Sequence, residues 1–242
     1  MLDNLMELCS HQNVQSGTLY VVATPLGNLG DLTLRAIQVL NVCDCIACET
    51  PRITKNLLMV LKLSHKELFM YRDAGEEKSA QRLLDRLHQG QTVALVSDAG
   101  TPTISDPGYR LVKLCREHSV PVIPVPGATA SIAALSVSGF PSDQFLFLGF
   151  LPVKQGPRQR LLDSYKDFRG TLIIYESPYR IQKLIELLKT ILDPQRYVFV
   201  ARELTKLNET FYRGAISEID AFQCPEKGEY VVLIAPSHVK KG

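Results

Sequence analysis

Short apolar runs recur along the chain at strand length, and amphipathic stretches separate several of them. Many of these runs are apolar throughout, which is typical of strands whose two faces are both covered by helices. The stretches between them place apolar residues at helical spacing, as in 32–40, 83–87 and 181–188. This alternation predicts an α/β fold. The predicted strands are 19–24, 45–49, 68–72, 92–98, 121–126, 145–150, 171–177, 197–203 and 229–235.

The length of the chain suits one large domain or two of modest size, because it has 242 residues and typical domains run to ~100–200 residues. A turn-rich stretch, 138–144, follows a helix of small residues just past the middle of the chain. We therefore expect two α/β domains, residues 17–138 and 139–242. A cleft between two such domains is where a ligand usually binds.

The composition is that of a soluble globular protein, with 45% apolar and 21% charged residues. No apolar run approaches the ~20 residues of a membrane span. The segment 1–8 lacks both the basic region and the long apolar run of a signal peptide. We expect a cytoplasmic protein, in which structural disulfides between the six cysteines are not expected.

Two further features bear on ligands. The single CxxC motif, Cys45 to Cys48, lacks a second pair or a His pair at zinc spacing, so we expect cysteines inside a strand and no metal site. Charge is unevenly distributed, because residues 150–213 hold 12 Lys and Arg against 7 Asp and Glu while the whole chain carries only +2. This local excess indicates a polyanionic partner.

Glycine-bearing loops of small residues follow three of the predicted strands in the first half: 25–33, 97–108 and 126–131. Glycine lets backbone approach a ligand, and the N-terminus of a following helix, which we expect Asp31 to cap after the first loop, favours anions or polar groups. Because open α/β sheets bind ligands at the carboxyl ends of their strands, three such loops predict a site there. The first loop is neither GxGxxG nor GxxxxGK[ST], which argues against a dehydrogenase and a P-loop protein.

These loops belong to a longer series of segments, in order "LYVVATPLGNLGDLTLRA", "SDAGTPTISDPG", "PVPGATASIAALSVSGFP", "FLGFLP", "YESPYR", "RELTK" and "GEYVVLI". Over about residues 17–236 the chain resembles the ribosomal RNA small subunit methyltransferase I family of the tetrapyrrole methylase superfamily. The resemblance implies two α/β domains with S-adenosylmethionine in the cleft between them. It also implies methyl transfer to the 2′-hydroxyl of a cytidine ribose in 16S rRNA, and a homodimer.

One motif departs from the family. The chain reads Glu49-Thr50-Pro51-Arg52 where the family usually reads Glu-Asp-Thr-Arg. We expect an active enzyme all the same, because aligning the methyl donor and the acceptor supplies most of the rate. Pro51 is also well suited to begin a helix, since its missing N–H would have no intrahelical partner there.

An alcohol acceptor is a poor nucleophile, so a side chain that accepts or polarises its proton would help. The candidates for accepting or polarising this proton are Asp98, Glu49, Glu176, Glu203 and Lys206. The predicted catalytic residues are Glu49, Arg52, Glu203 and Lys206. The cofactor-binding residues that the resemblance implies are Leu26, Ser97, Asp98, Thr101, Thr129, Ala130, Glu176 and Leu204.

Residues 152–160 read as a basic loop directly after a strand, which suits contact with RNA phosphates. Tyr179 is placed to stack on a base, whereas Tyr175 reads as a core residue. The predicted RNA-binding residues are Lys154, Arg158, Arg160, Tyr179 and Arg180.

Two other functions stay open. One is a methyltransferase for a tetrapyrrole, a diphthamide precursor or another small substrate, because a shared fold does not determine function. The other is a non-catalytic, ribosome-associated protein that binds S-adenosylmethionine, which the altered motif at 49–52 allows. Methyl incorporation into purified small ribosomal subunits separates the three.

Overall fold

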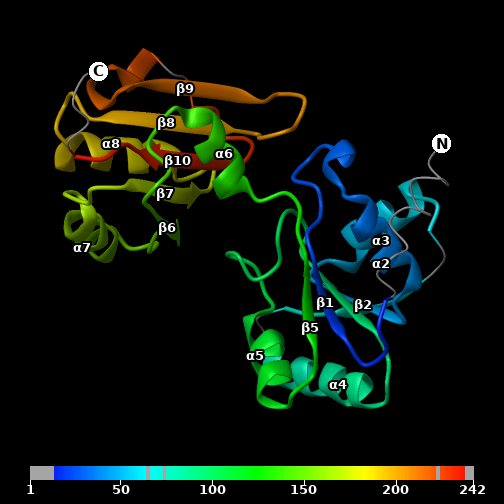
Figure 1. Ribbon diagram of the computed structural model, residues 1–242. Helices are drawn as coiled ribbons and strands as arrows, with labels where there is room; N and C mark the ends of the chain where they lie inside the picture. The colour runs from blue at the N-terminus through cyan, green and yellow to red at the C-terminus, as the bar shows by residue number, and fades with distance from the viewer. Residues whose placement is uncertain (1–13, 64–65, 73–74, 222–223, 238–242) are drawn as a thin grey trace. The chain divides into compact units, whose positions relative to one another are not determined.

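The computed structural model describes residues 14–63, 66–72, 75–221 and 224–237 (Figure 1). Residues 1–8, which lack the features of a signal peptide, lie outside the described residues, as does Cys9. The chain divides into two compact units, Met1–Thr129 and Ala130–Gly242. This division falls earlier in the chain than the domain boundary expected near 138, so it counts the helix at 130–138 with the second unit; the domain limits themselves stay a prediction.

The first unit contains a five-stranded sheet in the order β3-β2-β4-β1-β5. All of its strand pairs are parallel. The carboxyl ends of the strands therefore lie along one edge of the sheet. Its strands are β1 (Leu19–Val22), β2 (Cys45–Cys48), β3 (Glu67–Met70), β4 (Val93–Val96) and β5 (Val122–Val125).

Helices cover both faces of this sheet, as Figure 1 shows. One face packs Leu19 and Leu95 against α4 and α5, and the other packs Ile46 and Val96 against α2 and α3. Because successive strand residues point to opposite faces, two covered faces explain why every residue of β2 and β4 is buried. The helices are α2 (Leu34–Val42), α3 (Pro51–Val60), α4 (Glu76–His88) and α5 (Tyr109–Glu117).

Four cysteines of the first unit serve as packing residues. Cys43, Cys45, Cys48 and Cys115 are free and buried. Burial raises the pKa of Cys43 to about 12 and that of Cys115 to about 11, so both thiols stay protonated at neutral pH. Among the residues that the structure describes, no group of three or more His, Cys, Asp or Glu side chains is arranged to hold a metal ion.

The second unit contains a mixed five-stranded sheet in the order β6-β7-β10-β8-β9. β6 and β7 are parallel, and the remaining pairs are antiparallel. The strand at 210–215 was not predicted. This strand lies at the edge of the sheet, and most of its residues are not buried. Its sequence therefore lacks the apolar run by which the other strands were predicted. The strands are β6 (Phe145–Phe150), β7 (Thr171–Glu176), β8 (Tyr197–Arg202), β9 (Thr210–Ala215) and β10 (Tyr230–Ile234).

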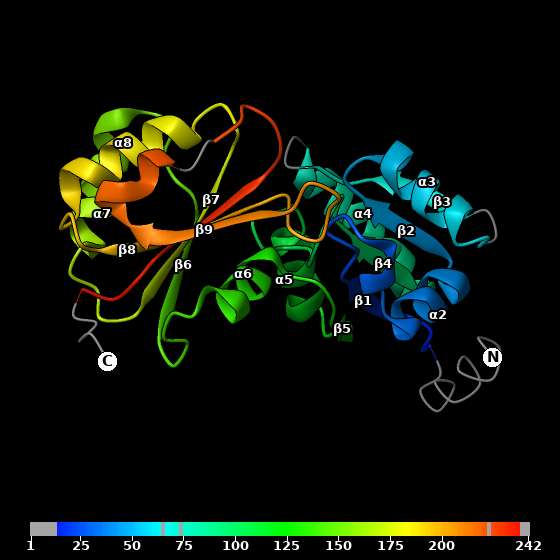
Figure 2. The ribbon, with the colours of Figure 1, turned by 90° about the horizontal axis from the view of Figure 1, so that it is seen from above.

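Helices α7 (Gln155–Tyr165) and α8 (Ile181–Ile191), with the 3-10 helix η3 (Ile216–Ala221), pack on one face of this second sheet. Helix α6 (Ala130–Ser138) packs against β7 and β10 on the other face, as Figure 2 shows. The buried residues of α6 include Ser131 and Ala134, whose small side chains allow close approach to the strands. Within the described ranges, no helix has the length and apolar character needed to cross a membrane.

Candidate functional site

The loops after β1 and β4 are joined at the carboxyl edge of the first sheet. Thr24 and Gly100 form two backbone hydrogen bonds, of 2.9 and 3.1 Å, as an isolated antiparallel bridge. The Thr24 hydroxyl also donates to the carbonyl of Ser97 at 3.2 Å. Leu26 packs at this junction, because a Cβ added to Gly100 would lie 3.2 Å from a Leu26 methyl carbon.

The loop after β5 joins the other two. The Thr101 hydroxyl donates to the carbonyl of Ala128 at 3.0 Å, and its oxygen lies 2.6 Å from that of the Thr129 hydroxyl. Gly127 passes so close to β1 that an added Cβ would lie 2.9 Å from Cβ of Ala23. β4, β1 and β5 are neighbours in the sheet, which explains the contact. The predicted convergence of three glycine-bearing loops is confirmed.

A fourth loop, which follows β2, is tied to the same edge. The Asp98 carboxylate accepts the backbone N–H of Thr50 at 3.1 Å, where Thr50 is the N-cap residue of α3. Arg72 donates to the carbonyl of Glu49 at 2.8 Å. α3 begins at Pro51 as predicted, and Arg52 is exposed in its first turn. Thr50 and Pro51, the two residues that depart from the family motif, therefore lie at the start of α3, where Asp98 binds the backbone.

The backbone of the loop 97–108 adopts conformations that side chains disfavour. Thr103 and Ser105 have φ values of 74° and 64°, in the left-handed region. Gly108 has φ 137°, and an added Cβ would lie 2.8 Å from the Leu95 side chain. Left-handed non-glycine residues cost of order 1–3 kcal/mol each and cluster at functional sites. The loop is thus built to a particular shape, beyond what a simple turn requires.

The predicted helix cap at Asp31 is wrong. A short 3-10 helix, η2 (Leu29–Asp31), ends there, and α2 begins three residues later. The N-cap of α2 is Thr33, whose hydroxyl oxygen accepts the N–H of Ala36 at 3.1 Å. Thr is among the residues preferred at this position because, like Asp, it offers a side-chain oxygen to the first turn.

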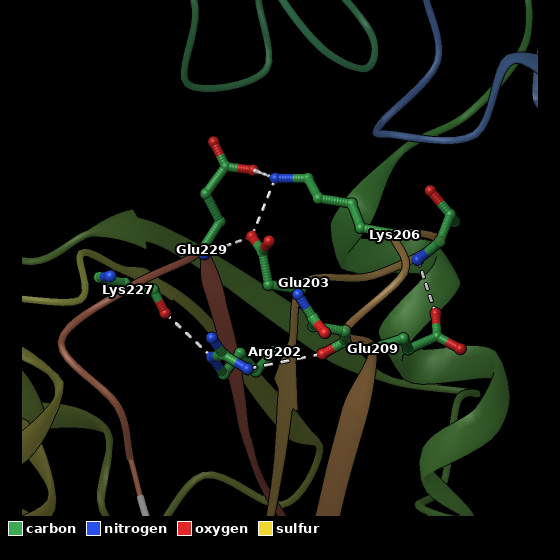
Figure 3. A network of polar contacts seen from close by, with 8 residues as sticks. Arg202, Glu203, Lys206, Glu209, Lys227 and Glu229 are labelled. Carbon is green, nitrogen blue, oxygen red and sulfur yellow. Dashed lines mark hydrogen bonds and ion pairs between the residues drawn. The ribbon is translucent and has the colours of Figure 1, made fainter.

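In the second unit, Lys206 lies between two carboxylates (Figure 3). Its ammonium nitrogen is 2.9 Å from Oε1 of Glu203 and 2.8 Å from Oε2 of Glu229. The backbone N–H of Glu229 also donates to the Glu203 carboxylate, at 3.1 Å. These three residues, called here the Glu203–Lys206–Glu229 network, combine two predicted catalytic residues with a third that was not predicted.

The network shifts the pKa values of Glu203 and Lys206. Burial is the largest single influence on the pKa of Glu203 and of Lys206, and it opposes the charged form of each. The ion pairs and hydrogen bonds together outweigh it, so that the pKa of Glu203 is lowered and that of Lys206 is raised. Lys206 is therefore protonated at neutral pH and cannot accept a proton.

The turn that carries the network is held from several sides. Glu203 and Thr205 have φ values of 54° and 65°. Arg202 donates to the carbonyl of Lys227 at 2.9 Å, and the N–H of Thr205 donates to the Glu209 carboxylate at 2.6 Å (Figure 3). Leu204, a predicted cofactor contact, is buried between these two strained residues.

Glu176 and Arg180, predicted for the cofactor and for RNA respectively, pair with each other. One carboxylate oxygen of the fully buried Glu176 side chain lies 2.6 Å from the Arg180 guanidinium and accepts the N–H of Ser177 at 2.8 Å. Among the described residues, the other oxygen is buried and has no hydrogen-bond partner. Arg180 also donates to the carbonyl of Leu151 at 3.4 Å. Glu176 thus orients Arg180 at the start of α8.

The predicted basic loop 152–160 is largely helical, because α7 begins at Gln155; only its first residues precede the helix. Arg158 is buried, and its guanidinium donates to the carbonyls of Pro152 and Val153 at 3.0 and 2.9 Å. Lys154, Arg160 and Tyr179 are exposed. Ala130, the last of the predicted residues to be placed, begins α6.

The chain shares its fold with a class of proteins, the tetrapyrrole methylases. A uroporphyrin-III C-methyltransferase from Thermus thermophilus, solved in complex with S-adenosyl homocysteine, shares this fold with a TM-score of 0.63 at 20% identity, over 90% of this chain and 97% of that one. The methyltransferase CobJ shares it with a TM-score of 0.69 at 18% identity, over 94% and 97%. The model of the family Tetrapyrrole (Corrin/Porphyrin) Methylases matches residues 18–220.

Sequence comparison narrows the class. The ribosomal RNA small subunit methyltransferase I of Synechocystis sp. is 47% identical over 221 residues, 90% of this chain and 79% of that protein. The protein of the same name from Escherichia coli O157:H7 is 44% identical over 230 residues, 93% and 80%. The chain therefore belongs to the ribosomal RNA small subunit methyltransferase I family, as its motifs predicted.

Proposed function

We propose that this chain transfers a methyl group from S-adenosylmethionine to the 2′-hydroxyl of a cytidine ribose in 16S rRNA. The observation that carries the proposal is the set of four loops tied together at the carboxyl edge of the first sheet, in a chain whose relatives are named small subunit rRNA methyltransferases. Open α/β sheets bind their ligands at this edge.

The residues at this edge fit a cofactor with hydroxyl, amino and carboxylate groups. Gly127 leaves no room for a side chain beside Ala23, so the loop after β5 packs directly against the residue that follows β1. Asp98 uses one carboxylate oxygen for Thr50, and an ionised carboxylate can accept about four hydrogen bonds. Asp98 can therefore hold a cofactor hydroxyl or amino group as well. We propose that the cofactor is held by Leu26, Ser97, Asp98, Thr101, Thr129, Ala130, Glu176 and Leu204.

S-adenosylmethionine supplies an electrophilic methyl group on a good leaving group. The residues of the chain then have to orient the ribose hydroxyl, exclude water and receive the proton that its oxygen releases. Because Lys206 is held protonated between two carboxylates, it acts as a fixed cation. Of the predicted catalytic residues, only Glu49 and Glu203 have a carboxylate that can accept the proton.

For the RNA, we propose that Lys154, Arg160 and Tyr179 make direct contact, since these side chains are exposed. Arg158 and Arg180 support the contact from inside, because their guanidinium groups are bound to backbone carbonyls. The family resemblance further supports a homodimer in the cytoplasm, and sedimentation equilibrium tests the dimer.

The experiment that tests the function uses small subunits from a strain that lacks the native enzyme. Incubation with this chain and labelled S-adenosylmethionine should add one methyl group to a cytidine. Methylation of the 2′-hydroxyl makes the adjacent phosphodiester resistant to alkali, so hydrolysis followed by mass spectrometry identifies the position chemically. Cofactor binding without transfer would favour the non-catalytic alternative, and transfer to a tetrapyrrole instead would favour the small-substrate enzyme.

The altered motif gives a second test of the same proposal. If Arg52 acts on the substrate, Arg52→Ala should lower the transfer rate by tenfold or more. Thr50→Ala should have little effect, because Asp98 binds the Thr50 backbone and not its side chain. Equal losses in the two variants would remove Arg52 from the catalytic set.

A further inference from the structure

An exposed cluster of aromatic, aliphatic and basic side chains lies at the carboxyl ends of β6 and β7. These strands are parallel neighbours, and Phe150 at the end of β6 is in register with Tyr175 near the end of β7. The segments that follow the two strands therefore meet at one edge of the second sheet (Figure 1). The cluster, called here the β6–β7 surface, consists of Phe150, Val153, Lys154, Arg160 and Tyr179.

Buried and partly buried charged residues hold this surface in shape. The Arg180 guanidinium, fixed by Glu176, donates to the carbonyl of Leu151 at 3.4 Å. Leu151 and Arg180 are the chain neighbours of Phe150 and Tyr179, so this bond brings the two aromatic residues to the same edge. Arg158 binds the carbonyls of Pro152 and Val153 from the first turns of α7. Two arginines thus fix the backbone of the segment that follows β6, and Arg180 ties it to the segment that follows β7.

The ring of Phe150 is held in place while much of it stays exposed. Its centroid lies 5.8 Å from that of Tyr175, at an interplanar angle of 68°. The Tyr175 ring packs edge-on against Phe147, with centroids 4.8 Å apart, and its hydroxyl accepts the N–H of Ser131 at 2.9 Å. Phe150 is nevertheless 54% exposed. Its position is set by a supporting ring and not by burial.

The chemistry of the exposed groups indicates the ligand. Tyr179 is 77% exposed and Val153 76% exposed, which is unusual for large side chains on so well-fixed a backbone. Residues 150–160 contain three basic residues and no acidic one, and the charge of Glu176 is balanced by Arg180. Exposed aromatic rings beside cations are how proteins bind unpaired nucleotides, by stacking on the base and attracting the phosphates.

We propose that the β6–β7 surface binds an unpaired nucleotide of the rRNA, with Phe150 and Tyr179 stacking on bases and Lys154 and Arg160 contacting the flanking phosphates. Phe150 and Val153 are new to the candidate site. Arg158, Glu176 and Arg180 act as positioning residues that build the surface. The inference rests on the proposed function in so far as rRNA is the substrate.

The test measures the binding of a single-stranded RNA oligonucleotide that carries the fluorescent base 2-aminopurine, whose emission is quenched on stacking. Phe150→Leu and Tyr179→Leu, which keep an apolar side chain but remove the ring, should each weaken binding by roughly tenfold and reduce the quenching. Phe145→Leu is the matched control, because Phe145 is 42% exposed at the opposite end of the same strand. It should bind RNA as the wild type does.

Phe150→Tyr and Tyr179→Phe keep a ring and should retain most of the affinity, and calorimetry with S-adenosylmethionine checks that each variant is folded. Wild-type affinity and quenching in both leucine variants would overturn the proposal. So would a loss that appears with assembled subunits and not with naked RNA, because the surface would then contact ribosomal protein. If ring-dependent RNA binding is found but no methyl transfer occurs, the proposed function fails while this inference stands.

Discussion

The two sheets organise their polar ends in different ways. At the carboxyl edge of the first sheet, backbone groups and the hydroxyls of Thr24 and Thr101 tie most of the loops together, and Asp98 is the carboxylate that joins the fourth. In the second sheet, charged side chains pair with one another, as in Glu176–Arg180 and the Glu203–Lys206–Glu229 network. The all-parallel first sheet brings several loops to one edge. In the second unit the charged pairs form between residues three or four apart at the end of a strand, and the antiparallel pairing of β8 with β10 adds Glu229 to one of them.

This contrast suggests a division of labour. Loops made of backbone and small side chains can shape themselves closely around a small molecule, and paired charges present a fixed electrostatic pattern to a larger one. Substitutions at the backbone-built edge should therefore have larger effects than substitutions in the charge-built elements.

The largest effect on stability is expected from Gly108→Ala, which adds a side chain at the end of the strained loop 97–108. The new Cβ would lie 2.8 Å from the Leu95 side chain and 2.9 Å from that of Thr103, at φ 137°. We expect a loss of about 2–4 kcal/mol in the free energy of unfolding, from strain and overpacking together. Urea denaturation measures it. Gly75→Ala is the control, because Gly75 also has positive φ, 83°, but an added Cβ there meets nothing within 4 Å; equal losses would show that packing around Gly108 is unimportant.

Asp98→Ala tests the carboxylate that joins two loops of the first sheet. Its removal leaves the Thr50 N–H without its acceptor, and we expect a loss of about 1–2 kcal/mol in stability and of tenfold or more in affinity for S-adenosylmethionine. Asp98→Asn keeps an acceptor oxygen for the Thr50 N–H and loses the negative charge. It therefore separates the structural role of Asp98 from its role in binding the cofactor. Calorimetry and urea denaturation report on them independently. Asp31→Ala, in the loop after β1, is the control; cofactor affinity equal to wild type in Asp98→Ala would contradict the assignment.

The positions of these loops could be predicted because their signals are local. Apolar runs identify the strands, and glycines and prolines identify the loops that follow them, as at Gly100 and Gly127. Glu176 and Arg180 are four residues apart, whereas the third member of the Glu203–Lys206–Glu229 network depends on pairing between strands distant in sequence. Glu229 meets Glu203 because β10 pairs antiparallel with β8, and nothing in "GEYVVLI" by itself indicates that partner. The start of α7 was missed because glycine and proline at 156–157 resemble a loop, although proline is well tolerated in the first turn of a helix.

The basic residues of the second unit should divide into two groups. Lys154→Ala with Arg160→Ala should weaken RNA binding severalfold and lower the slope of log K against log salt by about 0.7 for each phosphate of single-stranded RNA that is no longer neutralised. Arg158→Ala should instead lower the melting temperature, because it leaves the carbonyls of Pro152 and Val153 without their donor. Filter binding over a salt series and thermal unfolding distinguish the groups. A salt slope unchanged in the double variant would place Lys154 and Arg160 outside the RNA-binding surface.

The smallest effect is expected in the Glu203–Lys206–Glu229 network. Although burial opposes both charged forms, the ion pairs raise the pKa of Lys206 and lower that of Glu203. The contribution of Lys206 to stability is therefore complete below its unfolded pKa of about 10.4 and is lost as pH rises through the folded value. That of Glu203 is complete above about 4.3 and is lost as pH falls through the folded value. The network should stabilise the fold between these limits.

Glu229→Gln tests the alkaline limit of the pH range in which the network stabilises the fold. Glu229 is largely exposed, so we expect a loss below about 1 kcal/mol at pH 7. Because Lys206 would keep Glu203 but lose one of its two carboxylates, the alkaline fall in stability should begin at lower pH. The acid fall should stay where it is, since Glu203 keeps its ammonium partner. Urea denaturation from about pH 2 to about pH 12 covers both limbs, with the exposed neighbour Glu226→Gln as control. A shift of the acid limb alone would contradict this prediction. It would mean that Glu229 acts directly on Glu203 and that the pKa of Lys206 does not depend on Glu229.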